Sequence, residues 1–185
     1  VLTGLESHSI LFIDEIHRLR HSVEEILYPA MEDRAIDIVI GKGPSAKTLR
    51  LDLPEFTIIG ATTKLAMLSA PLRDRFGVDF RLDFYDETEL EHIVYQKAAK
   101  MNLPVEPEAA KEIARRGRMT SRIAVRILKR VRDLAVVQGD ESISLPRVRE
   151  VLAMLDIDEL GLDVTDRKIL TTLFYKFSAK PVGLN

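Results

Sequence analysis

The sequence comprises 185 residues, of which 46% are apolar and 30% are charged, with a formal net charge of −2. This composition allows one or two domains with a hydrophobic core, and the net charge alone indicates no particular partner. The absence of cysteine excludes disulfides and thiolate metal sites, and the lack of a signal peptide or of an apolar run of about 18 residues predicts a cytoplasmic protein without membrane contact.

Residues 9–18 (SILFIDEIHR) predict a short apolar strand that ends in two adjacent acids, Asp14 and Glu15. Asp14 can hold a hydrated Mg²⁺ while Glu15 faces an attacking water, which is the Walker B arrangement of phosphate-hydrolysing motors. The plain alternative is a buried strand with two acids at its exposed end. His17 and His21 stand four residues apart, but no third ligand in register supports a zinc site.

The next stretch predicts a helix and a hairpin. Residues 22–25 match a capping box and begin a helix that should run to about Glu32. Residues 36–40 and 49–53 alternate in polarity, and the turn-rich loop 41–45 between them predicts a protruding β-hairpin.

A second buried strand is predicted at 57–61, beside the first, and it leads into Thr62 and Thr63. A hydroxyl at this strand end could orient a water molecule or touch the γ-phosphate of a nucleotide. Threonine is also a good strand former and helix cap, so this position by itself leaves both interpretations open.

Arg73 and Arg75 lie on a short helix predicted around 72–76. Since they are two residues apart, they should point in different directions, so that one can pair with Asp74 while the other projects outward. An outward arginine beside a nucleotide site can act on a neighbouring subunit as an arginine finger. The alternative is a local surface ion pair. Another short strand is predicted at 80–84.

From Asp86 onward the pattern is helical, which places a domain boundary there. One helix should be capped by residues 88–91, and others should cover 107–117, 120–137, 146–155 and 165–177, with a break near 158–163. Residues 111–133 carry nine Lys/Arg against two acids, which favours phosphate or nucleic acid but also fits a solvated helix face. Arg122, at the start of the third helix, is a candidate nucleotide sensor.

The phosphate-binding loop Gly-x-x-x-x-Gly-Lys-Ser/Thr does not occur in the sequence. We therefore expect this chain alone not to bind ATP tightly. It starts at Val1 without an initiator Met, and we expect it to be a piece of a longer protein.

The sequence resembles the RuvB family of AAA+ ATPases, bacterial Holliday-junction branch-migration motors, along essentially its whole length. The similar strings are residues 11–18, 23–33, 60–63, 71–77, 122–124 and 161–168. The resemblance implies an α/β fold: the C-terminal part of an AAA+ P-loop core with a parallel sheet and an inserted hairpin (1–85). A helical lid (86–158) and the start of a winged-helix DNA-binding domain (159–185) should follow.

The resemblance also implies roles in hydrolysing ATP with Mg²⁺. Asp14 and Glu15 fall on Walker B, with Asp14 holding Mg²⁺ through water, and Thr63 falls on sensor 1. Arg73 matches the finger that acts in trans, and Arg122 matches sensor 2. Further nucleotide contacts are implied at Glu32, Asp33, Arg34, Thr62, Arg75 and Tyr85.

The implied partners are double-stranded DNA at a Holliday junction, a homo-hexameric ring and RuvA, in recombination and DNA repair. RuvA would dock on the hairpin 35–53, where Ile38 and Ile40 could form an exposed apolar tip, although alternating isoleucines could also face a core. The isolated fragment is expected to be inactive.

Three rival interpretations fit part of the sequence. Residues 14–17 also spell the DExH box of a different helicase superfamily, and the acids and arginines would also fit a clamp-loader subunit of the AAA+ class or a non-catalytic interaction fragment. One departure from the RuvB pattern concerns sensor 2: Met119-Thr120-Ser121 replaces the family's Gly-Thr-Pro before Arg122, but Thr120 can still cap the helix.

Overall fold

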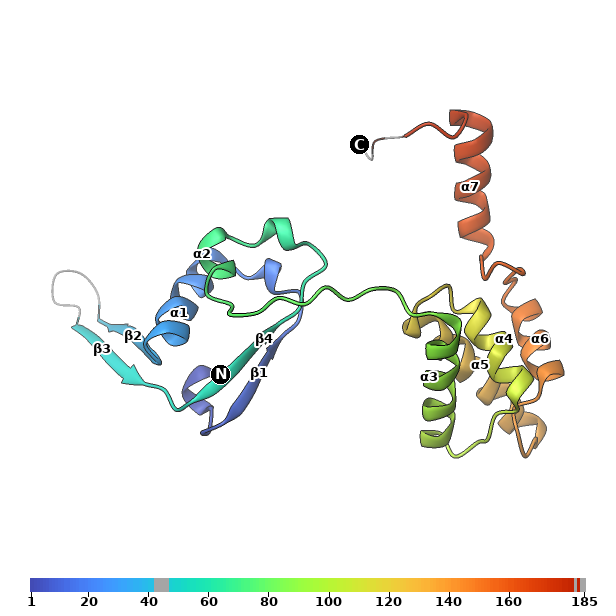
Figure 1. The fold of residues 1–185 in the computed structure, drawn as a ribbon, viewed down its shortest axis with the longest axis horizontal. Coiled ribbons are helices and arrows are strands. Elements are labelled where there is room, and N and C mark those ends of the chain that lie inside the picture. Colours follow the sequence, from blue (N-terminus) through green and yellow to red (C-terminus); the bar gives the residue numbers. More distant parts are fainter. Residues whose placement is uncertain (42–46, 182, 184–185) are drawn as a thin grey trace. The chain divides into compact units, whose positions relative to one another are not determined.

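The computed structural model describes residues 1–41, 47–181 and 183 (Figure 1). The chain divides into two compact units, Val1–Arg81 and Leu82–Asn185, which are described separately. In the described residues, no helix is long and apolar enough to cross a membrane.

The first unit is built on two parallel strands, β1 (Ser9–Ile13) and β4 (Phe56–Gly60), paired from Ser9↔Phe56 to Ile13↔Gly60. The chain between them forms helix α1 (His21–Glu32) and strands β2 (Ala35–Ile40) and β3 (Lys47–Asp52). After β4 comes the short helix α2 (Ala70–Arg73), and single 3₁₀ turns lie at Leu2–Gly4, Ile16–Arg18 and Leu65–Met67. Both predicted parallel strands are therefore present and adjacent.

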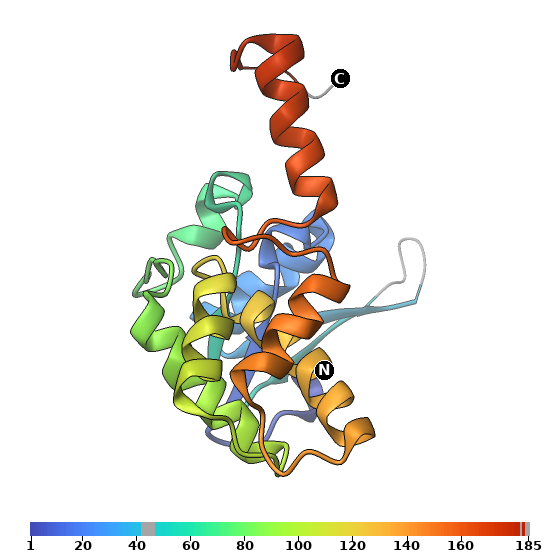
Figure 2. The same cartoon turned by 90° about the vertical axis from the view of Figure 1, so that its right-hand side faces the viewer.

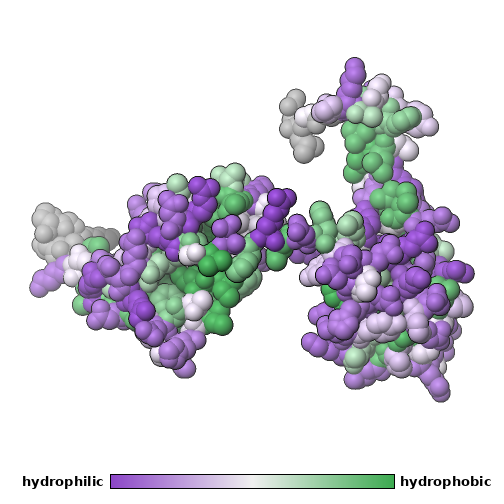
Figure 3. All heavy atoms as spheres, in the orientation of Figure 1, coloured by the Kyte–Doolittle hydropathy of each residue, from purple (hydrophilic) through white to green (hydrophobic). Residues whose placement is uncertain are grey.

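The prediction that these strands are buried is wrong. Ile10, Phe12 and Ile59 are 66%, 60% and 46% exposed, and apolar surface is visible on this unit in Figure 3. The apolar run indicates a strand suited to a covered sheet, but no part of the first unit within the described residues covers these side chains.

β2 and β3 form the predicted antiparallel hairpin, with Ile36 opposite Leu51 and Ile38 opposite Leu49. Only its base is buried: Ile36 packs with Ala30 and Leu53, whereas Ile38 and Ile40 are 37% and 56% exposed. Most of the predicted loop, residues 42–45, lies outside the described residues.

The predicted strand at 80–84 is wrong, because this segment has no regular structure and Phe80, Leu82 and Phe84 are 85%, 92% and 73% exposed. A strand needs a partner for its backbone hydrogen bonds, and no other strand in the described chain pairs with it. Alternation of apolar residues alone does not supply that partner.

The second unit contains α3 (Glu87–Lys100), α4 (Pro107–Arg116), α5 (Ser121–Gln138), α6 (Leu145–Met154) and α7 (Val164–Phe177). Helices α3 to α6 share a core in which Ile113, Leu128, Val131 and Val148 are fully buried. Helix α7 projects from this group in both views (Figures 1 and 2).

Three predicted caps are wrong. Helix α1 begins at His21 after Arg20, with no side-chain cap, so Ser22 is already helical. Helix α3 is capped by Asp86 together with Glu89, and Thr88, the expected cap, lies inside the helix. The Thr120 hydroxyl donates to the carbonyl of Gly117 (3.0 Å) and does not cap α5. Ser22 and Thr88 already lie inside their helices, and the Thr120 hydroxyl has a competing local acceptor, neither of which spacing alone reveals.

Candidate active site

The chain segments that follow β1 and β4 are held together at one edge of the sheet. The amide of Ala61 donates to the carbonyl of Ile13, and the amide of Ile16 donates to the carbonyl of Ala61, both at 2.9 Å. Because carboxyl ends of parallel strands meet at the same edge, the acids after β1 lie beside the threonines after β4. The structure thus brings together Asp14, Glu15, Thr62 and Thr63.

Glu15 stands at the centre of this group. Its backbone is left-handed (φ 49°), and its amide donates to Asp14 Oδ1 at 3.0 Å. The Thr63 hydroxyl donates to Glu15 Oε2 at 3.1 Å, and the Glu15 side chain is 38% exposed. Left-handed backbone in a residue other than glycine costs about 1–3 kcal/mol and concentrates at functional sites.

Asp14 is exposed at the same edge, which leaves its carboxylate accessible. Carboxylate oxygens supplemented by water are the ligands that Mg²⁺ prefers, so the donor chemistry at Asp14 fits a hydrated Mg²⁺. The half-exposed Glu15 carboxylate beside it can reach solvent water.

His17 also belongs to this group, although nothing in the sequence had assigned it to this site. Its ring is 7% exposed, and Nδ1 lies 2.8 Å from Thr62 Oγ1 and 3.1 Å from Glu15 Oε2. His21, its proposed zinc companion, instead lies 3.5 Å from Glu25. The only sequence signal for His17 was its position two residues after Glu15 in a tight turn.

Gly60 allows the edge to be compact. A Cβ there would lie 3.0 Å from Ile16 Cδ1 and 3.2 Å from Phe76 Cζ. A larger residue would make tight contacts there, so the Ile16 and Phe76 side chains would have to shift by a few tenths of an ångström.

Arg73 and Arg75 lie in two different environments. The guanidinium of Arg75 lies 3.0 Å from Glu32 Oε1 and 4.5 Å from the centre of the Tyr28 ring, and it donates to the carbonyl of Pro71 at 2.7 Å. The predicted local pair with Asp74 is therefore wrong, because helix α1 offers Arg75 a better partner. Arg73 is exposed, and within the described residues it has no ion-pair partner.

The three residues at the end of α1 that are proposed to touch nucleotide, the last helical residue and the two that follow it, all form ion pairs in this structure. Their partners are Arg75 for Glu32 (3.0 Å), Arg50 for Asp33 (3.1 Å) and Glu55 for Arg34 (2.6 Å). The side chains of all three are more than half exposed. The pairs of Asp33 and Arg34 are exposed on both sides and contribute little free energy, so they can exchange for other partners, whereas Arg75 is only 24% exposed in its pair with Glu32.

Tyr85 and Arg122 belong to the second unit. The amide of Tyr85 donates to the carbonyl of Met119 at 3.1 Å, which holds Tyr85 next to the start of α5, where Arg122 is exposed. Both proposed nucleotide contacts of this unit therefore lie near the start of α5. Met119 and Arg118 have left-handed backbone, which shapes this turn.

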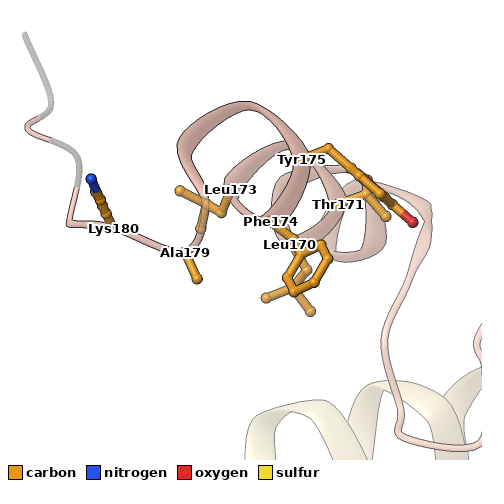
Figure 4. A pocket seen from close by; sticks show the side chains of 7 residues that line it. All are labelled: Leu170, Thr171, Leu173, Phe174, Tyr175, Ala179 and Lys180. Atoms are coloured by element: carbon orange, nitrogen blue, oxygen red, sulfur yellow. The ribbon is translucent and has the colours of Figure 1, made fainter.

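A hollow of about 510 Å³ lies elsewhere, on α7 (Figure 4). Leu170, Leu173 and Phe174 line much of it, and neither acid nor arginine does. It is therefore not the site described above.

Two family models match the chain: the Holliday junction DNA helicase RuvB P-loop domain over residues 1–82 and the RuvB AAA lid domain over residues 85–158. The chain belongs to the RuvB family. A curated relative, the Holliday junction branch migration complex subunit RuvB of Chloroflexus aggregans, is 55% identical over all 185 residues, which are 53% of that protein.

Solved RuvB structures from Thermotoga maritima share the fold. One mutant has a TM-score of 0.83 and 46% identity, covering 98% of this chain and 57% of the other. The structure described as the RuvB Holliday junction branch migration motor has a TM-score of 0.80 and 44% identity, covering 98% and 56%. The expected AAA+ α/β fold with a lid is thus confirmed, and the DExH-helicase and clamp-loader alternatives are set aside.

The chain spans about half the length of these RuvB relatives. Family membership places it in an AAA+ P-loop ATPase family. The division into residues 1–85, 86–158 and 159–185 remains a prediction, although the structure itself divides at Arg81 and Leu82.

Proposed function

We propose that the full-length protein containing this chain is an ATP-driven DNA motor subunit that drives Holliday-junction branch migration. Its RuvB family membership and the name of its Chloroflexus relative support this proposal. The observation that carries it is the convergence of Asp14, Glu15 and Thr63 at one sheet edge, with Arg73 exposed in the same unit.

In this proposal Glu15 acts as the general base. Its carboxylate is half exposed and is held by the Thr63 hydroxyl, so it can take a proton from a water that Thr63 helps to orient. Asp14 would hold Mg²⁺ through water. When bound, the ion offsets the negative charge that develops on the phosphates. Thr62 would contribute a further contact at the nucleotide.

Arg73 would act on the nucleotide of the neighbouring subunit in a homo-hexameric ring. A guanidinium supplied in this way raises the rate by about 10³ to 10⁵. Its exposure and its lack of an ion pair among the described residues favour Arg73 for this role over the anchored Arg75. The remaining nucleotide contacts proposed are Glu32, Asp33, Arg34, Arg75, Tyr85 and, as sensor 2, Arg122.

Two parts of the chain would contact partners: the hairpin would contact RuvA, and residues 159–185 would contribute to DNA binding. The exposed apolar tip of the hairpin, including Ile38 and Ile40, suits docking to RuvA. Duplex DNA would be held mainly through phosphates and largely without regard to sequence. Residues 159–185 would begin the winged-helix domain that takes part in this contact.

Rings assembled from two different variants test whether a neighbouring subunit supplies Arg73. Full-length Arg73→Ala and Glu15→Gln proteins should each lack ATPase activity. Mixed in equal amounts, they should form about a quarter of their interfaces with both residues intact and regain activity. Arg149→Ala, an exposed arginine on α6, is the matched control and should keep full activity.

Steady-state ATP turnover at several mixing ratios is the measurement. If rings shown to contain both variants recover no activity at any ratio, Arg73 does not act in trans. Arg75→Ala in the same mixtures shows whether the second arginine has this role instead.

A further inference from the structure

Helix α7 is attached to the lid at its first turn and not along its length. None of the residues of α7 is buried, and none of them belongs to the core that α3 to α6 share. The helix projects from that group of helices (Figure 2). Its direction relative to the lid therefore depends on the polar contacts at its start.

The turn between α4 and α5 supplies these contacts. The guanidinium of Arg116, the last residue of α4, donates to the carbonyl of Asp158 in the loop before α7. Arg116 also pairs with Glu112 one turn earlier on α4, and both side chains of this pair are only 12% exposed. The guanidinium of Arg118 pairs with Asp166, in the first turn of α7, at 2.5 Å. Two arginines of one turn thus hold the loop before α7 and the helix itself.

Gly161 brings the two segments into backbone contact. It is buried, and its φ of 78° lies in the left-handed region. A Cβ there would lie 2.6 Å from the carbonyl oxygen of Arg116 and 2.9 Å from Cγ of Arg118. A side chain at this position would force the loop away from the turn, and only glycine adopts this φ without strain.

The same turn also contacts the proposed nucleotide contacts of this unit. The carbonyl of Met119 accepts from the amide of Tyr85 at 3.1 Å, and Arg122 lies three residues further along, in the first turn of α5. Arg118 and Met119 are both left-handed, with φ values of 49° and 59°. This conformation is unfavourable for residues other than glycine and persists only where the surroundings impose it, so the turn has little freedom to adjust.

Five residues join the α4–α5 turn to the start of α7, and we call them the lid joint: Arg116, Arg118, Asp158, Gly161 and Asp166. We propose that the lid joint consists of positioning residues that transmit the movement caused by ATP turnover from Tyr85 and Arg122 to α7, and through α7 to DNA. This inference rests on the proposed function, because ATP turnover must drive DNA movement for the transmission to matter. It predicts variants that hydrolyse ATP normally but move DNA poorly.

The test uses the full-length protein with RuvA and a synthetic four-way DNA junction. Two rates are measured, ATP hydrolysis and separation of the junction, and their quotient is the number of junctions separated per ATP, the coupling ratio. Gly161→Ala should lower the coupling ratio about 3- to 30-fold while kcat for ATP stays within about twofold of the parent. Gly139→Ala is the matched control, because Gly139 has a similar φ of 76° but a Cβ there meets no atom within 4 Å. It should keep the parent coupling ratio.

The ion pair of the joint is tested by a double-mutant cycle. Asp166→Asn removes the charge but keeps an oxygen that can accept from the amide of Asp163 in the cap of α7, a contact of 3.2 Å. Asp166→Asn and Arg118→Leu should each lower the coupling ratio about threefold or more. The double variant should be no worse than the worse single variant, because both substitutions remove the same contact.

Arg149→Leu, at an exposed arginine on α6, is the matched control for Arg118→Leu and should keep the parent coupling ratio. Losses that add up in the double variant would show that Arg118 and Asp166 act separately, which overturns their place in the lid joint.

The coupling ratio separates positioning from damage to the fold. A lid that is merely destabilised loses ATP hydrolysis and junction separation together, and so its coupling ratio does not change. A lower ratio with normal ATP turnover supports the inference. A parent-like ratio in both Gly161→Ala and Asp166→Asn overturns it, whether the two rates persist or fall together.

The inference can fail separately from the proposed function. If the parent protein separates junctions and every lid-joint variant keeps its coupling ratio, only the inference is wrong. If the parent protein hydrolyses ATP but separates no junction, the proposed function fails and the inference fails with it.

Discussion

At the scale of single residues, the carboxylate of Glu15 is already engaged by Thr63 and by His17. A general base must be oriented toward its water yet keep an accessible lone pair, and a carboxylate has enough lone pairs for both. The buried ring of His17 touches Glu15 and Thr62 through the same nitrogen, so it limits where the carboxylate can move.

We predict that His17→Leu in the full-length protein lowers kcat about tenfold, because Glu15 loses one of the two groups that orient it. His17→Asn should retain much of the activity, since its amide can occupy the position of Nδ1. ATP turnover under saturating nucleotide is the measurement, and His21→Leu, at an exposed histidine, serves as control. Equal rates for His17→Leu and the parent would remove His17 from the site.

At the scale of elements, the start of α7 is tied closely to the loop before it. Asp163 accepts from the amide of Asp166 at 2.9 Å, and Asp158 accepts from the amides of Leu160 and Leu162, both at 2.9 Å. These backbone donors hold the pKa of Asp163 and of Asp158 below the ordinary 3.8. Arg118 adds an ion pair to Asp166.

The lowered pKa values predict that acid weakens this junction. Carboxylates whose folded pKa is depressed stabilise the fold above their ordinary pKa, and the stabilisation is lost as the pH falls below 3.8 through the folded values. Asp163→Asn should make helix content less sensitive to pH in this range. Helical circular dichroism between about pH 2 and 5 is the measurement.

Glu159→Gln makes the same charge change on the exposed turn before α7 and serves as the control for that titration. An identical acid response of Asp163→Asn and the parent protein would show that the cap does not contribute to the pH dependence of α7.

At the scale of the whole molecule, the described chain holds only part of the nucleotide site that we propose. The acids and threonines gather at one sheet edge, but the sequence has no phosphate-binding loop, and the chain spans about half of its RuvB relatives. Backbone amides of such a loop normally supply most of the contacts to the phosphates of ATP.

We therefore predict that this chain of 185 residues does not bind ATP with Mg²⁺ at micromolar concentrations, whereas the full-length protein does. Isothermal titration calorimetry of both proteins provides the comparison, and circular dichroism must first show that the shorter chain is folded. Micromolar binding to the 185-residue chain would contradict this prediction.

Local patterns in the sequence were sufficient for several conclusions. The apolar run before Asp14 and the run before Thr62 predicted two strands, and helix signals such as Pro107 and Gly117 located the lid helices within a few residues. These patterns work because they depend on residues a few positions apart, which contact each other in any fold that contains the element. They failed at 80–84, where a strand required a distant partner.

The tertiary structure alone decided which side chains meet. His17 contacts Thr62, and Ser69 contacts Glu24, although each pair is separated by 45 positions in the sequence. Arg75 pairs with Glu32 and not with its neighbour Asp74. Such contacts depend on how β1, β4 and α1 pack, and periodicity carries no information about that packing. The sequence by itself thus indicated the family and the candidate site residues, whereas the fold determined which of these side chains are held by contacts and which remain exposed.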